Sequence, residues 1–67
     1  MEKFSSRLKE LRLENNLSQE KLAKLTNLSQ ASIAKWELKQ RTPTLDNIIT
    51  LCNFFKVSAD YLIGLED

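Results

Sequence analysis

Residues 17–37, which read LSQEKLAKLTNLSQASIAKWE, decide the fold. Ser18 and Ser29 stand where helices can begin, because a serine hydroxyl accepts a hydrogen bond from a free N–H of the first helical turn. Asn27 lies between them and tolerates the left-handed conformation that ends a helix. The stretch therefore predicts a helix over about residues 19–25, a tight turn, and a second helix from Gln30, which is the helix-turn-helix pattern.

A further helix is predicted before this stretch. Phe4, Leu8 and Leu11 recur at i, i+4 and i+7, which places them on one face of a helix over about residues 3–15. Asn15 and Asn16 offer its C-terminal stop.

Two more helices are predicted after it. Pro43 interrupts helical geometry, Thr44 can cap a helix over about 45–55, and Ser58 can cap a short fifth helix that ends at Gly64. The residues expected to pack inward from the second and fourth helices are Leu22, Ala23, Leu25, Leu45, Ile48, Leu51, Cys52 and Phe55. The sequence thus predicts a compact all-α fold of five helices, in a single domain over 1–67, with the helix-turn-helix at about 18–38.

Composition excludes several classes of protein. One cysteine and no histidine leave no disulfide framework and no Cys/His metal cluster, so we expect no metal and no cofactor. We also expect no enzyme, because the chain has no histidine, no Gly-rich phosphate loop and no paired carboxylates accompanying a pocket. No apolar run approaches the about 20 residues of a membrane span and no signal peptide is evident. With a free cysteine, these features favour the reducing cytoplasm and no membrane partner.

Charge is distributed unevenly along the chain. Residues 1–42 contain nine Lys or Arg and five Asp or Glu, a net charge of +4, whereas residues 43–67 contain one Lys and four Asp or Glu, a net charge of −3. This asymmetry is compatible with a polyanion partner for the first part, although a bias of this size is also common by chance.

Several short motifs occur together in the order seen in one known family. They are RLKELR at 7–12, LSQEKLA at 17–23, Ile33 with Trp36-Glu37, Pro43, and Val57-Ser58 with Leu62. Over about residues 4–63 the chain resembles the lambda-repressor-like helix-turn-helix domains of the Xre (Cro/repressor) family. The resemblance implies a five-helix domain that binds double-stranded DNA, usually as a homodimer on a two-fold operator, and regulates transcription, with repression as the leading interpretation.

The resemblance also implies which residues read bases. Gln30, Ala31 and Lys35 fall where family members contact base edges, with Ser32 beside them. The chemistry agrees, because glutamine pairs with adenine, lysine reaches guanine and an alanine methyl meets the thymine methyl. The alternative is that Gln30 and Lys35 are ordinary solvated residues.

Other contacts are assigned to phosphates by the same comparison. Ser18 and Gln19 begin the first helix of the motif, and helix N-termini present free N–H groups to anions. Lys39, Gln40 and Arg41 follow the recognition helix and are further phosphate candidates. A charged loop of this kind is also often only solvated.

Similar domains further imply a structural ion pair and a dimer contact. Arg12 is expected to pair with Glu37 and to hold the motif on the first helix, since an unpaired carboxylate at the edge of the core would be costly. Phe54, Ala59 and Tyr61 cluster in the segment through which relatives dimerise, and we hypothesise that they contribute to a two-fold contact.

Departures from the family pattern leave an alternative function open. Lys39 and Lys56 stand where relatives often have glycine, so the geometry of those two helix ends is not determined by the sequence. Leu13, Leu38 and Phe54 are more apolar or bulkier than is usual at their positions. They would suit a protein-interaction or antitoxin-like module on the same fold, which binds a protein partner.

Overall fold

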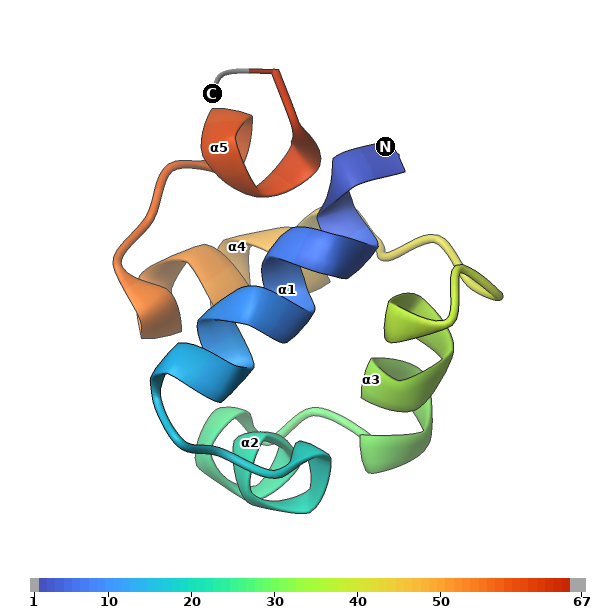
Figure 1. Ribbon diagram of the computed structural model, residues 1–67, viewed down its shortest axis with the longest axis vertical. Coiled ribbons are helices and arrows are strands. Elements are labelled where there is room, and N and C mark those ends of the chain that lie inside the picture. The colour runs from blue at the N-terminus through green and yellow to red at the C-terminus, as the bar shows by residue number, and fades with distance from the viewer. Residues whose placement is uncertain (1, 66–67) are drawn as a thin grey trace.

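The computed structural model of the chain describes residues 2–65. Over this range it has five helices and no strand, namely α1 (Glu2–Glu14), α2 (Gln19–Thr26), α3 (Gln30–Glu37), α4 (Leu45–Phe55) and α5 (Ala59–Ile63). Figure 1 shows α1 crossing the centre of the molecule with α4 behind it, α3 at one side, α2 below, and α5 near the N-terminal end of α1. The predicted all-α, five-helix fold is confirmed.

Each helix after α1 begins at a capping hydroxyl. The side chains of Ser18, Ser29, Thr44 and Ser58 accept hydrogen bonds from the backbone N–H groups three residues later, with N···O distances of 3.0–3.2 Å. These bonds satisfy N–H groups that have no partner inside the helix. The four predicted caps are confirmed, and the predicted ends of α1, α2 and α4 lie within one residue of those observed.

The helices end in left-handed turns. Asn16 and Asn27 have φ angles of 57° and 60°, and Lys39 and Lys56 have φ angles of 63° and 60°. Glycine takes this conformation without steric cost, whereas a lysine in it is destabilised because its Cβ lies too close to the following carbonyl oxygen. The chain therefore turns at Lys39 and Lys56 in the conformation that favours glycine, despite the lysine side chains.

A single cluster of apolar side chains from all five helices forms the core. α1 packs against α3 and α5, and α2 packs against α3 and α4. The buried apolar residues are Phe4, Leu8, Leu11, Leu22, Ala23, Ile33, Trp36, Ile48, Leu51 and Leu62. None of the helices in residues 2–65 has the length and apolar character needed to cross a membrane.

Two of the residues expected to pack inward are exposed instead. Leu25 is 50% exposed and Leu45 is 73% exposed. On the short helix α2, the Leu25 side chain points away from the buried face that Leu22 and Ala23 form. Leu45 is the first residue of α4 and lies one turn before Ile48, the first buried residue of that helix. Helical spacing marks an apolar stripe but does not determine how much of it the neighbouring helices cover.

Candidate nucleic-acid interface

The inner face of α3 is anchored in the core. Ile33 and Trp36 are buried, and the Trp36 ring meets the Phe4 ring edge to face at a centroid separation of 6.1 Å. The hydroxyl of Ser5 donates a hydrogen bond to the carbonyl oxygen of Trp36. α3 is therefore seated on α1, and the side of α3 opposite Ile33 and Trp36 faces outward.

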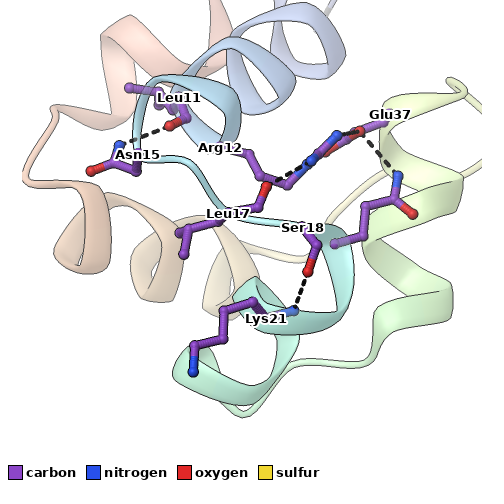
Figure 2. A network of polar contacts seen from close by, with 8 residues as sticks. Leu11, Arg12, Asn15, Leu17, Ser18, Lys21 and Glu37 are labelled. Atoms are coloured by element: carbon purple, nitrogen blue, oxygen red, sulfur yellow. Dashed lines mark hydrogen bonds and ion pairs between the residues drawn. The ribbon is translucent and has the colours of Figure 1, made fainter.

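A polar network holds the C-terminal end of α3 against α1 and α2 (Figure 2). Arg12 Nε lies 2.7 Å from Glu37 Oε2, and Arg12 Nη2 donates to Glu37 Oε1 at 2.9 Å. Arg12 Nη1 donates to the Leu17 carbonyl at 2.8 Å, and Gln19 Nε2 donates to Glu37 Oε1 at 3.1 Å. One carboxylate thus joins the end of α1, the start of α2 and the end of α3.

This network is largely removed from water. The side chains of Arg12 and Glu37 are 10% and 5% exposed. The hydrogen bonds to Glu37 raise the pKa of Arg12 above its ordinary range, although burial acts in the opposite direction. Arg12 is consequently a permanent cation, and its ion pair with Glu37 orients α3.

The outer face of α3 is open to solvent. Gln30, Ala31 and Lys35 are exposed and Ala34 is half-buried. Leu38, the C-cap residue of α3, is 66% exposed. The residues predicted to read bases are therefore together on one helix, and the side chains of Gln30 and Lys35 are accessible from outside.

One flank of this face is closed by the following loop. Arg41 Nη1 donates a hydrogen bond of 2.9 Å to the hydroxyl of Ser32, which also lies close to the start of α3. Gln40 is held by a bond of 2.8 Å from its N–H to the Lys35 carbonyl. The guanidinium of Arg41 is thereby brought from the loop to the first turns of α3.

The residues predicted to contact phosphates fall at two places. Ser18 and Gln19 begin α2, and Lys39, Gln40 and Arg41 follow α3 and are exposed. The Gln19–Glu37 hydrogen bond joins the first place to the end of α3. Sequence reasoning missed this bond and the Arg41–Ser32 bond, because they join residues 18 and 9 positions apart through side chains that no periodicity relates.

The residues expected at a dimer contact lie on α4 and α5, which pack against each other. Phe54 and Tyr61 are half-buried and Ala59 is exposed. Phe54 packs edge to face with Phe55 at 5.0 Å, and the guanidinium carbon of Arg7 lies 4.4 Å from the centre of the Tyr61 ring. Arg7 also donates a hydrogen bond to the Tyr61 carbonyl.

A family model described as helix-turn-helix matches residues 8–62. The chain belongs to this helix-turn-helix family. The family predicted from the sequence is confirmed, and the matched range contains both helices of the motif and the Arg12–Glu37 pair.

Curated relatives and a solved structure agree with this assignment. The uncharacterized HTH-type transcriptional regulator YobD of Bacillus subtilis is 33% identical over 64 residues, covering 96% of this chain and 57% of YobD. The HTH-type transcriptional activator BcrR of Enterococcus faecalis is 34% identical over 64 residues, covering 96% of this chain and 31% of BcrR. The chain thus spans between about a third and just over half of these proteins.

The restriction-modification controller protein C.AhdI from Aeromonas hydrophila has a similar structure. It is 38% identical to this chain, with a TM-score of 0.81 over 90% of this chain and 91% of C.AhdI. The arrangement of helices is therefore shared along nearly the whole length of both chains.

Proposed function

We propose that the chain is a sequence-specific DNA-binding regulator of transcription that inserts α3, from Gln30, into the major groove of a two-fold operator. The observation that carries the proposal is the outward face of α3, exposed at Gln30, Ala31 and Lys35 while its inner face is held by the core and by Glu37. The major groove of B-DNA is about 12 Å wide and admits one helix. The family assignment and the regulator relatives support the same function.

The charge around α3 suits a polyanion. Residues 30–42 contain three cations, Lys35, Lys39 and Arg41. Glu37, the one carboxylate of this range, is engaged by Arg12. Residues 30–42 therefore present positive charge whose one carboxylate is paired, which favours association with phosphates.

The phosphate contacts are assigned to both ends of the motif. At the start of α2, the Gln19 side-chain nitrogen donates one of its two hydrogens to Glu37 and keeps the other for a phosphate. The backbone N–H groups of Gln19 and Glu20, which lack helical partners, can donate to the same phosphate. The Ser18 hydroxyl accepts a bond from the Lys21 N–H and retains its own proton to donate. Lys39, Gln40 and Arg41 contact the backbone beyond the other end of α3.

A homodimer joined through α4 and α5 would place two copies of α3 on the two half-sites. Phe54 and Tyr61 supply half-buried aromatic rings and Ala59 a small exposed residue. A monomer at high micromolar concentration, both with and without operator, would contradict this contact.

Repression is the regulatory outcome we propose, with the chain acting in the cytoplasm. A small domain bound over a promoter excludes polymerase by occupancy alone, whereas activation requires an additional contact surface. A reporter gene under the bound operator distinguishes the two, because expression should rise when the chain is removed and fall when it is supplied. The opposite response would identify an activator, as BcrR is described.

Selection of bound duplexes from a random pool tests the proposed function. We expect a palindromic consensus with half-sites about 10 base pairs apart or a multiple of that spacing. Gln30→Ala and Lys35→Ala should each cost about 1–3 kcal/mol at particular base pairs, or about 5- to 150-fold in affinity. Lys9→Ala, at an exposed lysine of α1, serves as the matched control and should bind as the parent does. Unchanged affinity and base preference in both α3 variants would contradict the assignment.

A second candidate, a protein-interaction or antitoxin-like module, is favoured by the exposure of Leu13 and Leu38, which are 55% and 66% accessible. Surface leucines of this extent suit an apolar partner. Co-purification of a protein that Leu13→Ser releases, together with no salt-sensitive binding to any selected duplex, would favour this function over DNA recognition.

A further inference from the structure

Two side chains of α3 hold residues that come from neighbouring segments. Glu37 Oε1 accepts a hydrogen bond of 3.1 Å from Gln19 Nε2, at the start of α2. The Ser32 hydroxyl accepts a hydrogen bond of 2.9 Å from Arg41 Nη1, in the loop after α3. Gln19 and Arg41 are both proposed to contact phosphates, so α3 itself holds two of the side chains that would bind the DNA backbone.

Ser32 and Glu37 lie on opposite flanks of α3. They are five residues apart, which separates them by about 140° around the helix, and Ile33 and Trp36 fall within that arc. Because Ile33 and Trp36 are buried, Ser32 and Glu37 mark the two edges at which α3 emerges from the core. The residue held by Glu37 is therefore at one edge of the outward face, and the residue held by Ser32 is at the other.

Both held side chains keep donors for a second partner. The amide nitrogen of Gln19 has two hydrogens, of which one goes to Glu37. The guanidinium of Arg41 has five N–H groups in a fixed fork, of which one goes to Ser32. Arg41 is exposed, and a planar fork of this kind matches the two free oxygens of a phosphodiester. Each flank of α3 therefore presents a directed donor group to an anion.

The hydrogen bond from Ser32 places the Arg41 guanidinium before any DNA is bound. Arginine has a long side chain with many rotamers, and ordering it on a phosphate opposes binding. A guanidinium that is already oriented in the free protein loses less entropy when it meets the phosphate. Ser32 therefore contributes to DNA binding through Arg41 and not through a base edge.

We propose that α3 directs Arg41, held by Ser32, and Gln19, held by Glu37, onto phosphates of the two opposite DNA strands. A helix in the major groove has a sugar–phosphate strand on either side of it. Because Arg41 and Gln19 lie at opposite flanks, one strand meets the guanidinium and the other meets the amide. This inference rests on the proposed function, places the two contacts on different strands, and makes Ser32 a positioning residue instead of a base contact.

Single methylphosphonate linkages test the placement on two strands. They are introduced one at a time along each strand of a duplex obtained by the selection described above. A methylphosphonate is uncharged, so replacing a contacted phosphate should lower the affinity of the parent about tenfold. Arg41→Ala should reduce this loss by at least about twofold at a position on one strand, and Gln19→Ala at a position on the other. Effects of both variants on the same strand, or on neither, overturn the proposed arrangement.

Ser32→Ala tests the positioning role. We expect its affinity to fall about 2- to 12-fold, the factor that corresponds to one hydrogen bond, with the selected consensus and the salt dependence unchanged. Arg41→Ala should instead reduce the salt slope by about 0.9, because one phosphate is no longer neutralised. Ser6→Ala, at an exposed serine of α1 whose hydroxyl bonds within its own helix, is the matched control and should bind as the parent does. The urea midpoint of Ser32→Ala should change by less than about 0.5 M, which separates lost positioning from lost folding.

The results for Ser32 also distinguish this inference from the proposed function. A changed consensus in Ser32→Ala identifies Ser32 as a base contact and overturns its positioning role. An affinity that Ser32→Ala leaves unchanged, or lowers equally in the Arg41→Ala background, overturns that role as well. In each of these cases the duplex is still bound and the proposed function stands. A selection that yields no bound duplex overturns the proposed function and the inference together.

Discussion

Glu37→Ala should destabilise the fold far more than an ordinary surface substitution. The Glu37 carboxylate accepts three hydrogen bonds of 2.7–3.1 Å from Arg12 and Gln19. Without the Glu37 carboxylate, the Arg12 guanidinium keeps one acceptor of this network, the Leu17 carbonyl. The raised pKa of Arg12 means that the side chain cannot relieve its burial by losing a proton.

The magnitude follows from how little water reaches the pair. Side chains that are 10% and 5% exposed place it with buried ion pairs, for which removal of one partner costs about 3–5 kcal/mol. A solvent-exposed ion pair would contribute less than about 1 kcal/mol to the free energy of unfolding. A chain of 67 residues has a total stability of about 3–10 kcal/mol, so the substitution removes a large part of it.

Urea denaturation, followed by Trp36 fluorescence and by circular dichroism, measures the effect. With a slope of about 1 kcal/mol per molar urea for a domain this small, the midpoint should fall by about 3 M or more. Glu37→Gln keeps one acceptor oxygen, so its urea midpoint should lie between those of the parent and of Glu37→Ala. This second variant keeps the test informative if the alanine variant does not fold. Glu14→Ala, at an exposed carboxylate of α1, should change stability by less than about 0.5 kcal/mol.

A loss of less than about 1 kcal/mol in Glu37→Ala would refute the reasoning. The pair would then behave as a surface ion pair, and another contact would have to hold α3 on α1 and α2. A loss that Glu14→Ala reproduces would instead point to a general effect of removing negative charge.

Three further predictions concern the loop after α3 and the helix α4. Ser32→Ala and Arg41→Ala should each lower the affinity for the operator, measured by titration at fixed salt. Because Ser32 holds the Arg41 guanidinium, the binding free energy lost in the double variant should be smaller than the sum of the two single losses. Fully additive losses would contradict the coupling. Lys56→Gly should raise the thermal midpoint by a few degrees, since Lys56 sits at a φ of 60° where glycine avoids about 1 kcal/mol of steric cost; an unchanged or lower midpoint would argue against that cost. Burial raises the pKa of the Cys52 thiol in the folded state. The neutral thiol therefore contributes to the free energy of unfolding, fully so below the ordinary thiol pKa of about 8.5. This contribution is lost as the pH rises through the raised pKa of the folded state. The difference between the urea midpoints of the parent and of Cys52→Ala should therefore shift against the parent in alkaline solution, and a constant difference would contradict the burial of the thiol.

The sequence by itself determined the helices and the position of the motif. The signals are local, because a capping hydroxyl such as that of Ser18 or Ser29 bonds an N–H three residues away, and a left-handed residue such as Asn27 turns the chain at one position. The sequence also placed Gln30 and Lys35 on the helix that follows the turn, since their places depend only on where that helix begins.

The tertiary structure alone decided which side chains meet and which stay exposed. Gln19 donates to Glu37, and Arg41 reaches Ser32, because α1, α2, α3 and the loop are docked at particular angles that local spacing does not specify. The same docking leaves Leu45 uncovered, although its spacing marked it as a core residue. Helical periodicity gives the direction of a side chain, but burial and hydrogen bonding across helices depend on the neighbour that lies in that direction.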